Sequence, residues 1–137
     1  MASPVLNVSE LDDFAGGLSK TAQSIQKKQK PFLRKEGTKL KSRTLQEARK
    51  VKKKTGRYLK SIKRGKVYPY DGAQAVRVYS AAPHAHLIED GHRMVTHDGR
   101  EVGFVPGHHV FETAGKAFDP QYQRDVEDFL DEEVRKL

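Results

Sequence analysis

Apolar residues recur every three or four positions along the first part of the chain, which is the spacing of one face of an α-helix. The first stripe predicts an amphipathic helix from Ser9, as its N-cap, to about Gln29. Its members are Leu11, Phe14, Leu18, Ala22 and Ile25. Pro31 is expected to end or kink this helix, because proline has no backbone N–H to give to the preceding turn.

A second helix is predicted from about Phe32 to Lys54. Its stripe is regular but consists of small or modest side chains, namely Leu33, Gly37, Leu40, Thr44, Ala48 and Val51. So thin a stripe buries little by itself, which leaves two interpretations: a solvated helix, or an arm that packs against sister subunits. We therefore expect one domain overall, with an N-terminal helical arm at residues 1–54 and a core at residues 55–137.

A short helix is predicted after this arm. Thr55 is a candidate N-cap, and Gly56 allows a sharp turn of the chain. The apolar face of the helix is formed by Tyr58, Leu59 and Ile62. One or two turns are therefore expected before the chain becomes extended.

Two β-hairpins are predicted from alternating strands that flank Asp71-Gly72 and Asp98-Gly99. An Asp-Gly pair favours the tight turn of a hairpin, because both central residues adopt positive φ. The four strands cover about residues 66–70, 75–79, 93–96 and 101–105. Pro69 indicates an edge strand, because it cannot donate to a neighbouring strand.

The stretch between these hairpins, residues 76–92, is the segment around which we expect the chain to be organised. Pro83 interrupts the strand, and residues 84–90 are predicted as a short helical turn anchored by Leu87 and Ile88. Gly91 is expected to end the turn with a positive φ, the conformation that glycine adopts at least cost.

Two helical segments are predicted at the end of the chain. The first extends from His108 to Phe118, and a second is expected to restart at Asp119-Pro120, as N-cap and first helical residue, and to reach about Lys136. The terminal helix has an apolar face of Tyr122, Val126, Phe129, Leu130 and Val134. Its opposite face is acidic, with Asp125, Asp128, Asp131 and Glu132.

These elements predict an α+β fold. We expect a small antiparallel sheet of about four strands packed with the C-terminal helix and preceded by the long basic N-terminal arm. Hydrophobic residues make up only 36% of the chain, so only part of it is expected to form a core. Since there is neither an apolar run long enough for a membrane span nor a basic-then-apolar leader pattern, we expect a soluble, non-secreted protein with no membrane partner.

Charge is distributed unevenly along the chain. Residues 20–66 hold 19 Lys or Arg and only Glu36 and Glu47, a net charge of +17. Residues 119–137 hold seven acidic residues and three basic ones, a net charge of −4. This polarity favours either a nucleic-acid partner or contact between the basic and acidic ends of neighbouring copies. For the second case, the candidate charged interface is Lys52, Lys53 and Lys54 with Asp128, Asp131 and Glu132.

Histidines cluster between residues 84 and 109: His84, His86, His92, His97, His108 and His109. His84 and His86, with Glu89 or Asp90, could hold a divalent cation, but the spacing matches no known metal-binding motif and the chain has no cysteine. The interpretation favoured here is that these side chains are satisfied locally or lie at an interface. No nucleophile elbow or phosphate-binding loop is present, so neither an enzyme nor a cofactor is expected.

Three short motifs in this order resemble the neck and tail-completion proteins of long-tailed bacteriophages, the family that includes the minor tail protein Z type. They are Thr55-Gly56-Arg57-Tyr58-Leu59-Lys60-Ser61-Ile62, Pro83-His84-Ala85-His86-Leu87-Ile88-Glu89-Asp90-Gly91, and the segment from Pro106 to Ala114. The resemblance covers roughly residues 50–118. It assigns assembly or structural roles to Thr55, Gly56, Leu59, Ile62, Pro83, Ala85, Leu87, Glu89, Gly91, Pro106, Gly107, Phe111 and Ala114.

The resemblance implies a non-enzymatic virion protein, assembled in the host cytoplasm, that forms a ring of six copies at the head–tail junction around the DNA path. The implied partners are further copies of the chain, adjacent head-completion, tail-terminator or tail-tube proteins, and DNA in the lumen. A small basic protein that binds nucleic acid without sequence preference is the alternative.

Overall fold

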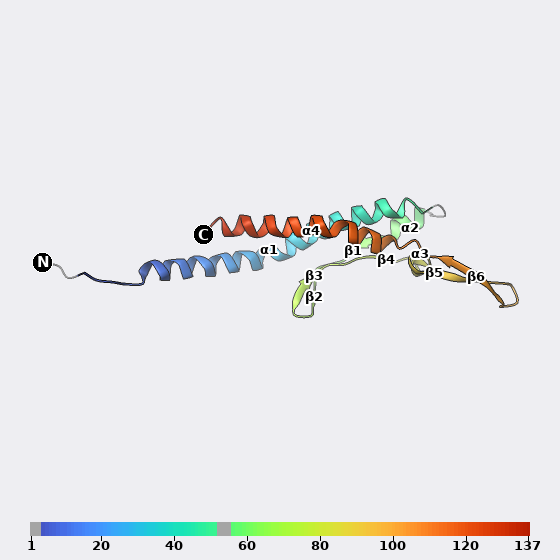
Figure 1. Cartoon of the computed structure of the whole chain (residues 1–137), viewed down its shortest axis with the longest axis horizontal. Helices are drawn as coiled ribbons and strands as arrows, with labels where there is room; N and C mark the ends of the chain where they lie inside the picture. Colours follow the sequence, from blue (N-terminus) through green and yellow to red (C-terminus); the bar gives the residue numbers. More distant parts are fainter. Residues whose placement is uncertain (1–3, 52–55) are drawn as a thin grey trace.

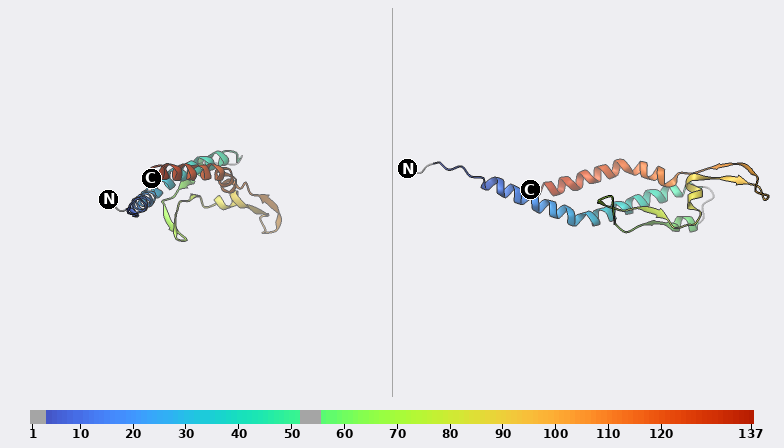
Figure 2. Two further views of the ribbon diagram at one scale, coloured as in Figure 1. Left: turned by 60° about the vertical axis from the view of Figure 1, so that its left-hand side comes forward. Right: turned by 90° about the horizontal axis from the view of Figure 1, so that it is seen from below.

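The structure, a computed structural model, describes residues 4–51 and 56–137. Its elements in chain order are α1 (Ser9–Ala48), α2 (Gly56–Ser61), β1 (Ile62–Arg64), β2 (Tyr68–Tyr70), β3 (Ala73–Ala75), β4 (Val78–Ser80), α3 (Ala85–Asp90), β5 (Gly91–Val95), β6 (Glu101–Pro106) and α4 (Val110–Val134). The molecule is elongated, and the two long helices lie side by side over part of their length (Figure 1). The N-terminus lies at one end of the molecule and the β5–β6 hairpin at the other (Figure 2).

α1 is a single helix where the sequence predicted two. Pro31 lies inside it, so the prediction of a separate second helix from Phe32 is wrong. The helix axis bends in its light-blue part, which the colour bar places around residues 25–35 (Figure 2, right). An interior proline costs about 3 kcal/mol. The helix continues because residues on both sides of Pro31 pack on one neighbour, α4.

The start of α1 also differs from the prediction. Ser9 is the first helical residue, and the N-cap is Val8. The side chain of Asn7 accepts hydrogen bonds at Oδ1 from the Ser9 backbone N–H at 3.1 Å and from Ser9 Oγ at 2.8 Å. Asparagine commonly makes this bond to a backbone two residues ahead, and here it takes the role that the sequence assigned to Ser9.

α4 is likewise one helix, with Pro120 in its interior, so the predicted restart at Asp119-Pro120 is wrong. Its buried residues continue in phase across the proline, with Ala114 and Phe118 before it and Glu133 after it. This continuous packing face outweighs the loss of one helical hydrogen bond at the proline.

α1 and α4 pack antiparallel from Ser24 and Lys28, which contact the end of α4, to Ala48, which lies near its start. The ring of Phe32 lies 4.8 Å from that of Phe129 and 6.4 Å from that of Tyr122, measured between centroids. The stripe predicted for residues 33–51 is buried in part, at Gly37, Thr44, Ala48 and Val51. This part of the arm therefore packs on α4 and the strands of its own chain, whereas both interpretations of the sequence left it without a partner in that chain. The division at residues 54 and 55 stays a prediction.

The strands form three antiparallel pairs, β1–β4, β2–β3 and β5–β6, in the described residues. The α+β class is confirmed, as are the hairpins around Asp71-Gly72 and Asp98-Gly99, but the strands pair two by two and β1 was not predicted. β1–β4 and β2–β3 are two parts of one long hairpin. Arg64 pairs with Val78 and Tyr68 with Ala75, so the first strand holds one extra residue between the two pairs.

This long hairpin lies against α1. A Cβ on Gly37 would come within 2.9 Å of the Arg64 side chain and 3.2 Å of that of Val76. Gly37 therefore allows a close approach of the hairpin to the helix. The small core lies beside it and contains Ala48, Val51, Tyr58, Ile62 and Val110.

Gly91 stands where two backbone segments meet. It has φ +84° and ψ −179°, which confirms the predicted positive φ; this region of backbone space is essentially restricted to glycine. A Cβ there would also collide with the Val105 carbonyl and come within 2.7 Å of the Gly107 nitrogen. Beside this contact, His108 N–H donates to the Ile88 carbonyl at 2.7 Å.

Gly91→Ala should therefore lower the free energy of unfolding by about 2 kcal/mol or more, because strain and collision add. Denaturant unfolding of the purified chain measures this loss. Gly99→Ala is a matched control, because Gly99 has φ +88° but a Cβ added there would meet nothing within 4 Å. Equal losses in the two variants would show that the close approach at Gly91 contributes nothing.

Candidate assembly interface

The second and third sequence motifs meet at the start of α4. The carboxylate of Glu89 accepts hydrogen bonds from the backbone N–H groups of Phe111, at 2.9 Å, and Glu112, at 3.1 Å. The residue at the N-cap position, His109, has φ 48° and offers no side-chain cap. Glu89 therefore caps the helix from a distant part of the sequence, and its negative charge suits the positive end of the helix dipole.

Other motif residues support the core beneath this cap. Ile62 and Ala114 are buried, and Leu59, Ala85 and Phe111 pack against the buried cluster. Leu87 and Gly107 are half-buried, whereas Gly56, Pro83 and Pro106 are exposed. Thr55 lies outside the described residues. The three motifs are thus brought together mainly as a structural joint, with exposed members only at its rim.

A charged cluster joins α1 to the end of α4, and the sequence analysis did not find it. The side chain of Glu133 is only 3% exposed. Lys28 Nζ donates to Oε1 of Glu133 at 2.6 Å, and Ser24 Oγ donates to Oε2 at 2.8 Å. The Lys28 ammonium, followed by the Ser24 hydroxyl, lowers the pKa of Glu133 to about 2. Its position in the sequence could have indicated this burial, because Glu133 follows Phe129 by four residues and so lies on the same face of α4.

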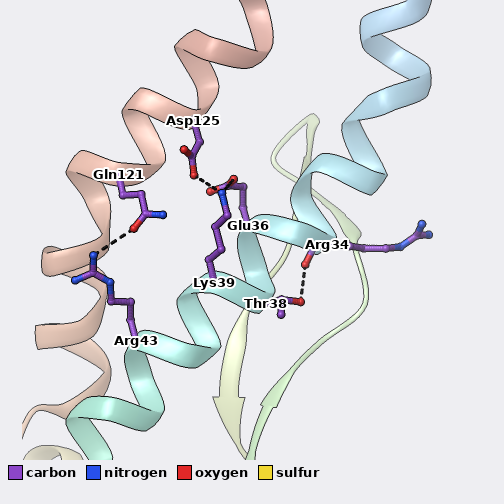
Figure 3. Close-up of polar contacts among 7 residues, drawn as sticks. All are labelled: Arg34, Glu36, Thr38, Lys39, Arg43, Gln121 and Asp125. Atoms are coloured by element: carbon purple, nitrogen blue, oxygen red, sulfur yellow. Dashed lines mark hydrogen bonds and ion pairs between the residues drawn. The ribbon is translucent and has the colours of Figure 1, made fainter.

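A second cluster lies near the middle of the helix pair (Figure 3). Lys39 Nζ donates to Asp125 Oδ2 at 2.8 Å and to Glu36 Oε1 at 3.3 Å. Asp125 is 20% exposed and faces α1, so its predicted place on the acidic outer face is wrong. The Lys39 ammonium lowers the pKa of Asp125.

Glu36 is the strained member of this cluster. Burial raises its pKa, and the neighbouring Asp125 raises it further, against the effect of Lys39. Among the described residues its Oε2 atom has no hydrogen-bond donor. Two carboxyl groups this close favour a shared proton, and a protonated Glu36 would donate to Asp125. Glu36 precedes Gly37 in the packing stripe, which is the signal that the sequence analysis missed.

The predicted charged interface is only partly described. Asp128, Asp131 and Glu132 are exposed, and within residues 4–51 and 56–137 no hydrogen bond or ion pair holds their side chains. Lys52, Lys53 and Lys54 lie outside the described residues. The acids are therefore available to a partner, while the ion pairs between α1 and α4 use Glu133 and Asp125.

Large apolar side chains are exposed at both ends of the molecule. Near the N-terminus these are Val5, Leu6, Val8, Leu11, Phe14 and Leu18. On the β5–β6 hairpin they are Met94, Val95, Val102 and Phe104. Exposed apolar patches of this kind mark surfaces that bind other molecules.

The sequence of the chain was compared with models of known protein families. The sequence model of the HK97-gp10-like family, described as "Bacteriophage HK97-gp10, putative tail-component", matches residues 12–91. The chain belongs to this family. It is a family of structural components associated with the phage tail, which confirms the phage part of the resemblance and implies a place in the virion. Comparisons with curated proteins and with solved structures give no significant match.

The matched range runs from α1 to the glycine at the backbone crossing, Gly91. It leaves out the rest of β5, β6 and α4, so the acids of α4 that pair with α1 lie beyond it. None of the helices in the described part of this tail component is long and apolar enough to cross a membrane. In the same part, no three His, Asp or Glu side chains come together as a metal-binding group.

Glu133→Gln should lower the melting temperature at pH 7, because it removes the charge that Lys28 and Ser24 bind. A carboxyl with a lowered pKa stabilises the fold above its unfolded pKa, so the deficit should shrink as pH falls from about 4.5 towards 2. Thermal unfolding across this range measures it. Glu132→Gln is the matched control, and an equal deficit in this exposed neighbour would contradict the assigned role.

Glu36→Gln should raise the stability of the fold, whereas Glu133→Gln should lower it. It keeps the shape of the side chain, removes a buried charge and gives Asp125 a donor, so we expect a gain of about 1 kcal/mol at pH 7. The gain should shrink as pH falls, because the raised pKa lets wild-type Glu36 take up a proton in the folded state. A loss of stability at pH 7 would show that the ionised carboxylate is needed.

Proposed function

We propose that this tail component is a non-enzymatic subunit of a ring in the phage neck, of the minor tail protein Z type. The ring would consist of six copies at the head–tail junction, would complete the tail, and would join it to the head around the DNA path. Its other partners would be head-completion, tail-terminator or tail-tube proteins. It would assemble in the host cytoplasm.

The observation that carries this proposal is the family match, over more than half of the chain. The distribution of apolar surface supports it, because the buried core is small and large side chains remain exposed at both ends. A subunit that buries these side chains against neighbours gains stability that the isolated chain lacks. The exposed acids of α4 would add charged contacts around such an interface.

A second function is favoured by the basic surface of α1. Lys20, Lys27, Lys30, Arg34 and Lys35 are all exposed, and Arg34 points away from α4 in Figure 3. A row of such side chains can neutralise phosphates without reading bases. The alternative is therefore a small protein that binds nucleic acid without sequence preference. A ring around DNA would also give this surface a use.

Charge reversal separates the two functions. Replacing Lys52, Lys53 and Lys54 with Glu should weaken assembly in a salt-dependent way, because each exposed pair contributes only ~0–1 kcal/mol and the sum matters. Replacing Asp128, Asp131 and Glu132 with Lys in the same chain should restore part of the assembly. Electron microscopy and analytical ultracentrifugation of the purified proteins measure it, with the exposed acids Asp119 and Glu127 changed to Lys as a reversal outside that set.

The DNA-binding function predicts a different pattern. The first set of changes would then abolish retention of random DNA, the second set would rescue nothing, and the wild-type chain would remain a monomer. This result would overturn the ring.

A further inference from the structure

The N-terminal segment, defined here as residues 4–18, protrudes beyond α4. A Cβ on Gly17 would lie 3.4 Å from the Leu137 side chain, so the earlier part of α1 extends past this contact. Residues 9–16 add about 12 Å of helix. Within this part, Leu11, Phe14 and Leu18 fall at the spacing of one helix face and are 67%, 57% and 45% exposed.

The β5–β6 hairpin protrudes at the opposite end (Figures 1 and 2). Only its base is held, by α3 and by the crossing at Gly91. Met94, Val95, Val102 and Phe104 are between 47% and 62% exposed. Val102 and Phe104 lie two residues apart and share one face of the hairpin, whereas Met94 pairs with Gly103 and lies on the other face. A two-stranded hairpin is marginally stable in water by itself and needs a further layer on its apolar side chains.

The N-terminal segment is acidic, and basic residues lie near the base of the hairpin. The N-terminal segment contains Glu10, Asp12 and Asp13 and no Lys or Arg. At the hairpin end, α2 and β1 present Arg57, Lys60 and Lys63, all exposed, and Figure 1 places α2 beside α3 at the base of the hairpin. The hairpin itself is balanced, with Arg93 and Arg100 against Asp98 and Glu101, so the complementary charge lies at its base. Opposite charges beside two apolar surfaces favour one orientation of contact between two molecules.

We propose that the N-terminal segment of one copy packs on the β5–β6 hairpin of a second copy. The helix face of Leu11, Phe14 and Leu18 covers Val102 and Phe104 on one face of the hairpin, and its acids lie near the basic residues of α2. This contact deepens the proposed function, on which it rests, by naming the two surfaces that join neighbouring subunits. It is heterologous, so it leaves one free surface of each kind and generates a ring when the rotation closes.

Two double variants of the full chain test the contact. The N-terminal variant carries Leu11→Ser and Phe14→Ser, and the hairpin variant carries Val102→Ser and Phe104→Ser. All four side chains are exposed in the single chain, so helix content should be unchanged. Each variant should associate about tenfold or more weakly than the wild type, as expected when central apolar side chains of an interface are lost. Tyr70→Ser is the matched control, because Tyr70 is an exposed aromatic outside both surfaces.

A mixture of the two variants gives the decisive result. Each variant retains the surface that the other lacks, so an equimolar mixture should form heterodimers of about twice 15.5 kDa and grow no further. Analytical ultracentrifugation detects this species. If the hairpin variant associates by itself, or if the mixture remains monomeric, the head-to-tail contact is overturned.

Cross-linking keeps the test independent of the folding of the variants. The chain has no cysteine, so Leu11→Cys in one copy and Val102→Cys in another can form a disulfide only with each other or with themselves. We expect the mixed product on oxidation, and none with Tyr70→Cys in place of Val102→Cys. If the wild-type chain forms rings but the Leu11→Cys variant cross-links to the Tyr70→Cys variant instead, this contact is overturned and the proposed ring remains. If the wild-type chain is always a monomer, both the contact and the ring are overturned.

Discussion

The antiparallel contact between α1 and α4 is the interaction on which the rest of the structure depends. It joins segments about a hundred residues apart, and it runs from the Lys28–Glu133 ion pair, through the aromatic stack of Phe32 on Phe129, to the small residues around Ala48. The position of α4 in turn fixes the helix start that Glu89 caps. The crossing at Gly91 then sets the direction in which the β5–β6 hairpin leaves the molecule. A change in the packing of α4 on α1 would therefore also displace the Glu89 cap, the crossing at Gly91 and the β5–β6 hairpin.

Two buried carboxylates in this contact behave in opposite ways because their surroundings differ. Glu133 accepts hydrogen bonds from the Lys28 ammonium, the Ser24 hydroxyl and, at 3.4 Å, the Lys136 ammonium, and its pKa falls. Glu36 shares one lysine with a second carboxylate, and burial raises its pKa. A buried charge contributes stability only where donors satisfy its oxygens, so one end of the helix pair is fixed by charge while its middle holds a carboxyl that costs stability.

Local elements were predictable from the sequence where a local rule decides them. Asp71-Gly72 specified a tight turn in which both residues have positive φ, and Asp98-Gly99 indicated the second hairpin, although there the longer loop of residues 96–100 joins the strands and only the glycine of the pair has positive φ. The position of Gly91 after a short helical segment indicated its positive φ. The prolines misled the prediction, because the rule that proline ends a helix takes no account of a packing partner. The four-residue spacing continues in phase across Pro31 and Pro120, and this continuity was the better signal. The identity of the partner, α4, could not be obtained from a stripe alone, because a stripe specifies a face and not what covers it. The same holds for the candidate site. Short motifs identified Glu89 and Gly91, but the charged clusters between α1 and α4 could not be predicted without knowing that the two helices pair.

The same reasoning applies to the part of α1 that has no partner within the chain. Its apolar spacing does not stop where α4 ends, since Leu18, Phe14 and Leu11 carry the pattern onward to the first turn. A helix that is solvated along its whole length gains nothing from such a stripe, and exposed leucine and phenylalanine at helical spacing favour unwanted association. Within the fold, α4 covers this apolar stripe. Each unit of apolar area in its exposed continuation costs the same free energy in water as it would if the covered part were exposed. The overhanging helix and the uncovered hairpin are therefore the two surfaces that the proposed contact between copies would cover, in a family described as phage tail components.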